Sequence, residues 1–214
     1  MKTGAFIVFE GIDGSGKTTQ ANKLNQELLK RGYSTLLTWE PGGTKLGDTV
    51  ANWLKTTPIR SPATELFLLS AARSHHIDHL IGPALEKGTI VICDRFTPST
   101  IAYQGYGRQM DLNLIDMINV EATRNIVPDL TILIDIPVEV ASARNKIKDK
   151  DVWEAETELF HQRVRAGYLD QASKQNRHMV KLDGASTPTV IFEEVIKHVY
   201  GFLCHLHISP NLNQ

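Results

Sequence analysis

The chain has 214 residues, enough for one α/β domain with a full core, and its 42% hydrophobic content is ordinary for a globular protein. The formal net charge at pH 7 is −1, which argues against a general role on nucleic acids or membrane surfaces, since such roles need a basic excess. Two cysteines, Cys93 and Cys204, give no disulfide framework, and we expect a cytoplasmic protein. The short apolar run at the N-terminus predicts neither a signal peptide nor a membrane span.

Strand-like and helix-like segments alternate along the chain. The predicted strands are Phe6–Phe9, Thr35–Trp39, Thr89–Cys93, Leu130–Ile136 and Met179–Leu182. The predicted helices are Lys17–Arg31, Leu46–Leu54, Pro62–Leu80 or beyond, Leu112–Thr123, Val138–Lys146, Glu154–Lys174 and Thr189–Leu203. Runs such as TIVIC and LTILI are apolar throughout, which is typical of a parallel sheet covered on both faces. The alternation predicts a doubly wound α/β fold with five strands, whose ligands bind beyond the carboxyl ends of the strands.

A glycine-rich segment follows the first strand. Gly11, Gly16, Lys17 and Thr18 fit the spacing GxxxxGK[ST], the phosphate-binding P-loop pattern. Its glycines let backbone N–H groups point at phosphate oxygens, Lys17 reaches the β- and γ-phosphates, and the Thr18 hydroxyl is a ligand for Mg²⁺. The alternative is an ordinary turn, but the strand before it and the helix after it favour nucleotide binding.

Two further motifs follow the second and third strands. The EPGGT segment, Glu40 to Thr44, would by itself be interpreted as a plain turn. Asp94 and Arg95 come directly after TIVIC, where Asp94 could hold Mg²⁺ through water and Arg95 could bind a phosphate; a structural pair capping the next helix is the alternative. After them, polar groups at helical spacing could contact a nucleobase and a sugar, namely Ser99, Thr100, Tyr103 and Gln104.

Three other features are ambiguous when taken alone. Arg73, after an apolar helix face, could be functional or could extend to water. The charged run from Arg144 to Glu156 suits a solvated helix surface, or else a lid that carries cations over the γ-phosphate. The histidines His75, His76 and His79, and those of the CHLH segment near the C-terminus, are expected on the surface rather than in a metal site.

Taken together, these motifs resemble the thymidylate kinase family. The family pattern is matched by FEGIDGSGKTT, by EPGGT, by Arg73, and by DRFTPSTIAYQ, and the resemblance extends through PDLTILIDIP to LDGASTP near the C-terminus. The resemblance implies a single P-loop kinase domain over residues 1–207, with the P-loop NTPase fold and a short lid at about 144–156. It also implies a cytosolic homodimer that makes dTDP from dTMP and MgATP. The polar composition of residues 208–214 predicts a disordered tail, and the net charge predicts no nucleic-acid or membrane partner.

The resemblance also assigns roles to residues. The catalytic group is Lys17, Arg95, Asp13 and Arg144. ATP would be bound by Gly11, Ile12, Asp13, Gly14, Ser15, Gly16, Lys17, Thr18 and Thr19, and Mg²⁺ by Thr18 and Asp94. Acceptor dTMP would be bound by Asp13, Glu40, Pro41, Leu69, Arg73, Arg95, Ser99, Thr100, Tyr103 and Gln104. Within this set Arg73 faces a thymine carbonyl, Thr100 and Gln104 reach the base edge, and Tyr103 packs where a 2′-hydroxyl would be.

Two positions depart from the family pattern. Leu69 stands where a phenylalanine usually stacks on thymine, and stacking contributes about 1–3 kcal/mol per base. In the lid, Val152 replaces the arginine of a DRxE motif, leaving Arg144, Lys146, Lys148 and Lys150. Because lysine lacks the planar fork of arginine, we expect a slow kinase in which Lys146 or Lys148 substitutes poorly.

Other functions remain open at this point. Leu69 admits a kinase for a different nucleoside monophosphate, and the altered lid admits a protein that binds nucleotide without turnover. A GTPase is disfavoured because Asn145-Lys146-Ile147-Lys148 lacks the final aspartate of NKxD. A DNA-handling ATPase is disfavoured by the charge and by Asp94-Arg95 in place of an Asp-Glu pair. Trp53 and Phe67 lie on apolar helix faces that suit a dimer surface as well as core packing.

Overall fold

All five predicted strands form one parallel sheet in the computed structural model, which describes residues 4–57, 61–145, 156–174 and 178–210. The strands are β1 (Phe6–Glu10), β2 (Thr35–Trp39), β3 (Ile90–Asp94), β4 (Leu130–Asp135) and β5 (Met179–Asp183). Their spatial order is β2-β3-β1-β4-β5. The order places β1 in the middle, so that the loop after β1 lies at the point where the chain switches from one side of the sheet to the other. The predicted five-stranded fold is confirmed.

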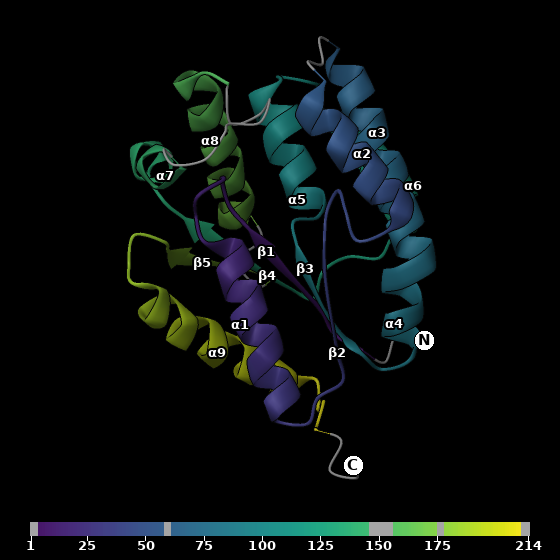
Figure 1. The fold of residues 1–214 in the computed structure, drawn as a ribbon, viewed down its shortest axis with the longest axis vertical. Coiled ribbons are helices and arrows are strands. Elements are labelled where there is room, and N and C mark those ends of the chain that lie inside the picture. The colour runs from purple at the N-terminus through teal and green to yellow at the C-terminus, as the bar shows by residue number, and fades with distance from the viewer. Residues whose placement is uncertain (1–3, 58–60, 146–155, 175–177, 211–214) are drawn as a thin grey trace.

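Helices cover both faces of this sheet (Figure 1). They are α1 (Lys17–Lys30), α2 (Lys45–Thr56), α3 (Pro62–His76), α4 (Gly82–Glu86), α5 (Thr97–Thr100), α6 (Leu112–Thr123), α7 (Val138–Asn145), α8 (Glu158–Lys174) and α9 (Pro188–His205). Two π-helical segments, η1 (Ile77–Ile81) and η2 (Ile101–Gly107), continue α3 and α5. No helix among the described residues is long and apolar enough to cross a membrane.

Alternate residues of the strands supply two hydrophobic cores. Ile7 and Phe9 of β1 pack with α1 and α9 on one face, whereas Phe6 and Val8 pack with η1 and α4 on the other. A third cluster joins β4 to η2 and α8, with Phe160, Val164 and Tyr168 as its large side chains. Because a parallel strand buried on both sides has no polar face, the apolar strand sequences follow directly from this layering.

Two elements differ from the predicted ones by more than two residues. The helical segment from Thr97 to Gly107 was absent from the predicted helices, although polar groups within it were noted at helical spacing, because Pro98, Gly105 and Gly107 interrupt the apolar periodicity. The helix α8 begins at Glu158 rather than Glu154, since the Thr157 hydroxyl accepts the Phe160 N–H at 3.2 Å as a cap.

The C-terminal end is ordered further than expected. Ile208 donates its N–H to the Leu203 carbonyl oxygen at 3.1 Å, and its side chain packs against the α1–α9 core. The first residue of the expected tail is therefore packed, while residues 211–214 lie outside the described part of the chain.

Candidate active site

The glycine-rich loop after β1 has the geometry that phosphate binding requires. At Gly11 the φ angle is 144°, and a Cβ atom there would lie 2.5 Å from the carbonyl oxygen of Ile134 in β4. Gly16, at φ 94°, is the N-cap of α1. A glycine has no side chain to accept the first N–H groups of the helix, so these donors remain for an anion, and the helix dipole favours one.

Two cations converge on the Asp13 carboxylate in this loop. Arg95 Nη2 lies 2.6 Å from Asp13 Oδ1, Lys17 Nζ lies 3.4 Å from the same oxygen, and the Tyr103 hydroxyl donates to Oδ2 at 2.9 Å. Burial raises the pKa of Asp13, but the charges of Arg95 and Lys17 outweigh it, and the pKa lies well below its usual range. Asp13 therefore stays ionised and holds both cations at the mouth of the loop.

Arg95 is fixed at the end of β3 by its backbone and by its side chain. Its φ angle is 74°, and its N–H donates to the Phe9 carbonyl oxygen at 2.9 Å. Its Nη1 donates to Ser99 Oγ and to the Tyr168 hydroxyl, both at 3.0 Å. A non-glycine residue in the left-handed region persists only where its surroundings hold it, and these contacts do so.

A buried carboxylate, Glu10, underlies this group of residues. It accepts the Phe96 N–H at 2.8 Å, the Ser99 hydroxyl at 2.7 Å and the Tyr168 hydroxyl at 3.0 Å. Burial raises the pKa of Glu10, against the lowering effects of Arg95 and of the hydrogen bonds. Glu10 thus ties the end of β1 to α5 and α8, the elements that position Arg95.

The two residues expected to bind Mg²⁺ are in direct contact, as the Thr18 hydroxyl donates to Asp94 Oδ2. The other oxygen, Asp94 Oδ1, is buried and has no hydrogen-bond partner among the described residues. A hydroxyl beside a carboxylate with a free buried oxygen fits Mg²⁺, which takes oxygen ligands and usually binds through one or two carboxylates together with substrate phosphates.

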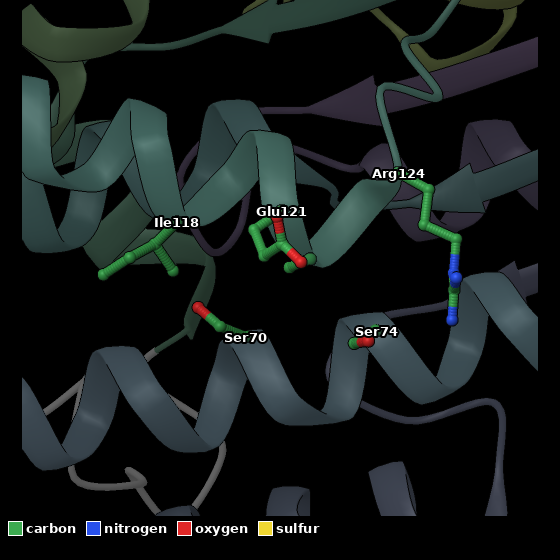
Figure 2. Close-up of a pocket in the computed structure, with 6 residues that line it drawn as sticks. Ser70, Ser74, Ile118, Glu121 and Arg124 are labelled. Atoms are coloured by element: carbon green, nitrogen blue, oxygen red, sulfur yellow. The ribbon is translucent and has the colours of Figure 1, made fainter.

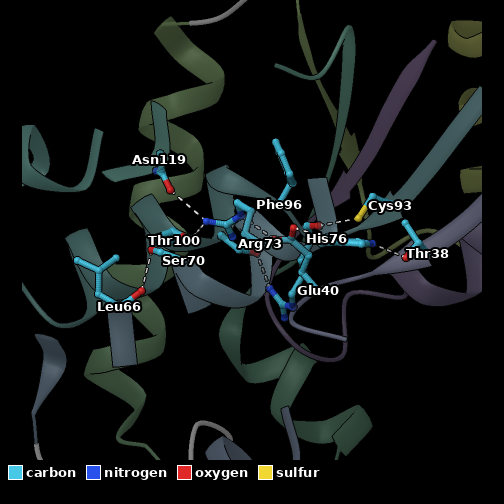
Figure 3. Close-up of polar contacts among 12 residues, drawn as sticks. Thr38, Glu40, Leu66, Ser70, Arg73, His76, Cys93, Phe96, Thr100 and Asn119 are labelled. Carbon is cyan, nitrogen blue, oxygen red and sulfur yellow. Dashed lines mark hydrogen bonds and ion pairs between the residues drawn. The ribbon is translucent and has the colours of Figure 1, made fainter. Parts of the chain in front are cut away.

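At the other end of the site, Arg73 is buried among acceptors (Figure 3). Its Nε donates to Glu40 Oε2 at 2.7 Å, and its Nη1 donates to Thr100 Oγ1 at 2.8 Å and to Asn119 Oδ1 at 3.0 Å. The guanidinium also lies over the Phe96 ring, 5.3 Å from its centroid. Since Arg73 is only 3% exposed, it does not extend to water, and the structural alternative considered for it is wrong.

Glu40 is held from its second oxygen by a histidine. His76 Nδ1 lies 3.3 Å from Glu40 Oε1, and His76 Nε2 lies 2.7 Å from Thr38 Oγ1, as Figure 3 shows. His76 is 1% exposed, so the prediction of a surface histidine is wrong at this position. An ionised carboxylate only accepts hydrogen bonds, so Nδ1 carries a proton. The contact between His76 and Glu40 could not be predicted from sequence, because His76 follows His75 in a stretch that looks polar.

The segment that supplies Glu40 also starts a helix. The Glu40–Pro41 peptide is cis, and at the end of the same segment the Thr44 hydroxyl caps α2 by accepting the Gly47 N–H at 3.0 Å. EPGGT is therefore both a turn that starts a helix and the source of Glu40. Leu69 is half-buried, and it packs against a small cluster of Val50, Leu54 and Ala72 between α2 and α3.

Comparisons with known proteins bear on this geometry. The thymidylate kinase family model matches residues 9–195. A thymidylate kinase of Thermomicrobium roseum is 44% identical over 192 residues, covering 89% of this chain and 91% of its own. One from Geotalea daltonii is 44% identical over 193 residues, covering 86% and 90%.

A crystal structure of thymidylate kinase from Ehrlichia chaffeensis superposes with a TM-score of 0.75 at 37% identity, covering 92% of this chain and 98% of that one. The chain belongs to the thymidylate kinase family. The resemblance inferred from the motifs is confirmed, and the P-loop NTPase fold with it.

The described part of the predicted lid contributes one arginine to this thymidylate kinase site. Arg144, in the last turn of α7, donates Nη1 to the Gly14 carbonyl oxygen at 3.3 Å and Nη2 to the Gly184 carbonyl oxygen at 2.9 Å. It thereby connects the phosphate-binding loop to the loop after β5. Lys146, Lys148, Lys150 and Val152 lie outside the described residues.

Besides His76, four polar residues of the site were missed in the sequence: Glu10, Glu65, Asn119 and Tyr168. Each is at least nine-tenths buried and bonds a residue that was predicted to act. A glutamate closing the apolar run FIVFE was a usable signal for Glu10, because charged groups are rarely buried without partners. The other three lie within helices, where nothing in the spacing distinguishes them from surface residues.

Proposed function

We propose that this protein transfers the γ-phosphoryl group of ATP to dTMP, giving ADP and dTDP. Membership of the thymidylate kinase family supports this proposal. The observation that carries it is the pairing of Lys17 and Arg95 on one carboxylate, Asp13. Lys17 belongs to the ATP-phosphate loop, whereas Arg95 belongs to the segment that leads to Ser99, Thr100 and Tyr103. One acid thus holds a donor-side cation and an acceptor-side cation next to each other.

This arrangement suits phosphoryl transfer between two anions. The acceptor phosphate is already a nucleophile at neutral pH, so catalysis needs little general-base chemistry and depends on alignment and charge neutralisation. Lys17 and the loop amides would hold the β- and γ-phosphates, and Arg95 would bridge acceptor and donor. A Mg²⁺ ion held by Thr18 and Asp94 would neutralise charge on the donor phosphates.

The donors of Arg73 support a carbonyl-bearing base. Its Nε and Nη1 hydrogens are used by Glu40, Thr100 and Asn119, whereas no hydrogen bond of Nη2 is found within the described residues. Guanidinium nitrogens only donate. Two donors on a buried, fixed arginine therefore favour a carbonyl oxygen such as that of thymine, and disfavour an amino group at the same position.

The test is ADP release from MgATP with dTMP, dUMP, UMP, dCMP or dGMP as acceptor, using Lys17→Ala as the blank. We expect release to be fastest with dTMP and to be lost in the variant. Faster release with another acceptor would replace dTMP in the proposal and would point to Leu69 as the altered contact. Nucleotide binding without release in any reaction would refute kinase activity.

We also infer a homodimer that uses the face formed by α3 and α6. These two helices carry five exposed apolar side chains: Phe67 on α3, and Leu112, Leu114, Met117 and Val120 on α6. Between these helices a groove of about 310 Å³ is lined by Ser70, Ser74, Ile118, Glu121, Ala122 and Arg124 (Figure 2). Exposed apolar side chains gathered on one face mark interaction sites.

Light scattering on the size-exclusion peak tests the dimer. Met117→Lys places a charge among these apolar side chains and should give a monomer. Leu29→Lys is the matched control, because Leu29 is 52% exposed on α1 and lies outside the α3–α6 face. Equal masses for the wild type and Met117→Lys at low micromolar concentration would exclude this face.

A further inference from the structure

A buried carboxylate lies behind the glutamine that is expected to reach the base. Glu65 on α3 and Gln104 in η2 are each 1% exposed, and Gln104 Nε2 donates to Glu65 Oε1 at 2.5 Å. The opposite carboxylate oxygen, Glu65 Oε2, pairs with Arg108 Nη2 at 3.2 Å. A carboxylate paired with arginine accepts hydrogen bonds and donates none. The amide of Gln104 must therefore turn its NH₂ group toward Glu65.

This constraint decides what Gln104 offers to a ligand. With its nitrogen on Glu65, its carbonyl oxygen Oε1 is directed elsewhere, and that oxygen is buried without a hydrogen-bond partner among the described residues. Gln104 follows Tyr103, which bonds Asp13, and lies four residues after Thr100, which bonds Arg73. From this spacing we infer that the buried oxygen and Arg73 Nη2, for which no hydrogen bond is found among the described residues, face the same ligand, since a partnerless buried acceptor is costly unless a ligand satisfies it.

We propose that Glu65 is a specificity-determining residue of this enzyme, acting by fixing the orientation of the Gln104 amide. The proposal rests on the proposed function. With the amide fixed, Gln104 presents an acceptor and Arg73 presents donors. This pair matches a pyrimidine edge with a ring N–H beside a carbonyl, as in thymine and uracil. Cytosine has the reverse pattern, with an unprotonated ring nitrogen beside an amino group.

The fixed orientation makes the rejection of cytosine strong. If the amide could rotate by 180°, Gln104 would offer NH₂ and could bond the cytosine ring nitrogen. Here that rotation would place its oxygen against the Glu65 carboxylate, so two acceptors would face each other in a buried site. Sites with committed hydrogen-bonding groups discriminate far better than sites that rely on shape, because a mismatched substrate leaves buried groups unpaired.

The carboxylate itself cannot move away. Arg108 bonds Glu65 and also Glu156, which precedes α8, and its guanidinium lies over the Phe160 ring at 4.7 Å from the centroid. Three elements therefore fix Arg108, and Arg108 fixes Glu65. Uracil and thymine share this edge, so the network predicts selection against dCMP and no selection between dTMP and dUMP.

The experiment compares two variants that make the same chemical change to partners of Arg108. Glu65→Gln frees the Gln104 amide to rotate, because the new amide can donate as well as accept. Glu156→Gln also replaces a carboxylate on Arg108, but among the described residues no hydrogen bond joins Glu156 to Gln104. For both, kcat/KM is measured with dTMP, dUMP and dCMP at saturating MgATP, and KM is measured separately for ATP.

We expect Glu65→Gln to narrow the preference for dTMP over dCMP by about tenfold or more, mainly through KM for the acceptor. The dTMP:dUMP ratio and KM for ATP should stay as in the wild type. Glu156→Gln should keep the dTMP:dCMP preference whatever its turnover. A folded Glu65→Gln protein whose dTMP:dCMP preference is within twofold of that of Glu156→Gln would overturn the proposal.

A second variant guards against a failure to fold. Glu65→Asp keeps the charge for Arg108 but shortens the side chain by one methylene, withdrawing it from Gln104, and it should narrow the same ratio. An unchanged ratio in a folded Glu65→Asp protein, when Glu65→Gln is insoluble, would also overturn the inference. Absence of dTMP-dependent ADP release in the wild type would instead refute the proposed function, so the two failures are distinguishable.

Discussion

Replacing Glu40 by glutamine tests whether the buried Arg73–Glu40 pair holds the base end of the site together. The side chains of Arg73 and Glu40 are 3% and 5% exposed, and the two oxygens of Glu40 are divided between Arg73 Nε and His76 Nδ1. Glutamine keeps the size of the side chain but has one acceptor oxygen and no charge. The variant therefore leaves the Arg73 cation buried without an anion, and it leaves one of the two donors facing an NH₂ group.

The expected cost follows from these contacts. Removing one member of a buried ion pair destabilises by about 3–5 kcal/mol, because the other charge stays buried. The remaining amide oxygen can still accept one hydrogen bond from a charged donor, which is worth about 1.5–3 kcal/mol, so we expect a net loss of about 2 kcal/mol. For a domain of this size each kcal/mol lowers Tm by about 2–4 °C, which gives a decrease of roughly 4–8 °C.

The assays are calorimetric unfolding and acceptor kinetics. Asp78→Asn is the control, since Asp78 pairs with Arg124 on the surface and exposed ion pairs contribute little to stability. A Glu40→Gln protein should have the lower Tm and a raised KM for dTMP, with KM for ATP unchanged. A Tm within 1 °C of the wild type would show that Arg73 does not depend on Glu40, and would refute this reasoning.

Three further outcomes are expected. Gly11→Ala should lower Tm and raise KM for ATP, because its Cβ would lie 2.5 Å from the Ile134 carbonyl oxygen at a φ of 144°. The control Gly201→Ala in α9 meets open space and should stabilise the protein by about 0.5–1 kcal/mol. Calorimetry on both variants checks this, and equal Tm changes would contradict it. Burial raises the pKa of Glu10 in the folded protein, so the stability that Glu10 contributes is present below pH 4.5 and is lost as pH rises through the raised value. In urea unfolding, the free energy of unfolding of Glu10→Gln should therefore rise relative to that of the wild type between pH 4 and pH 8. A difference between the two proteins that stays constant with pH would contradict this. Leu69→Phe should lower KM for dTMP by about two- to tenfold by adding ring stacking on the base; an unchanged or higher KM would show that a ring at position 69, which borders the cluster of Val50, Leu54 and Ala72, does not stack on the base.

The sheet was predictable because strands that are buried on both faces have sequences that are apolar throughout. All five strands appear within one residue of the predicted bounds, since each is a short apolar run that ends where a polar motif begins. The segment from Thr97 to Gly107 was not predicted as a helix. It is held by contacts with α8, such as those of Phe160 and Val164 with Gly107, which are 53 and 57 residues apart in the sequence. Local periodicity does not reveal contacts between such distant residues.

Only the site residues that belong to recognisable sequence motifs were predictable. Asp13, Lys17 and Arg95 follow strands directly, and their convergence follows from the geometry of a parallel sheet. His76 and Glu65 show what motifs omit. Both lie on α3, and their importance depends on which residues of β2, η2 and α6 fold against that helix. The general preference of histidine for the surface therefore led to the wrong prediction for His76.

The buried acids explain how a chain with a net charge of −1 can hold so many cations at one site. Asp13 holds Lys17 and Arg95, Glu40 holds Arg73, and Glu65 holds Arg108. Each acid neutralises its cation and also fixes which hydrogens remain free, so the donors are oriented before the substrates arrive, as electrostatic preorganisation requires.

Arg73 and Arg95, at the two ends of the site, differ in how many of their hydrogen-bond donors are already used by the protein. No hydrogen bond of Arg73 Nη2 is found in the part of the chain that the structure describes, so in the proposed function this end of the site is already arranged to receive a carbonyl group. Both Nη atoms of Arg95 are bonded to protein oxygens, those of Asp13, Ser99, Tyr103 and Tyr168. A phosphate can reach these donors only by displacing some of those oxygens. The base can therefore bind before the phosphate does. A nucleotide with the wrong base forms fewer hydrogen bonds at Arg73, so it has less binding free energy available to displace the oxygens that Arg95 bonds.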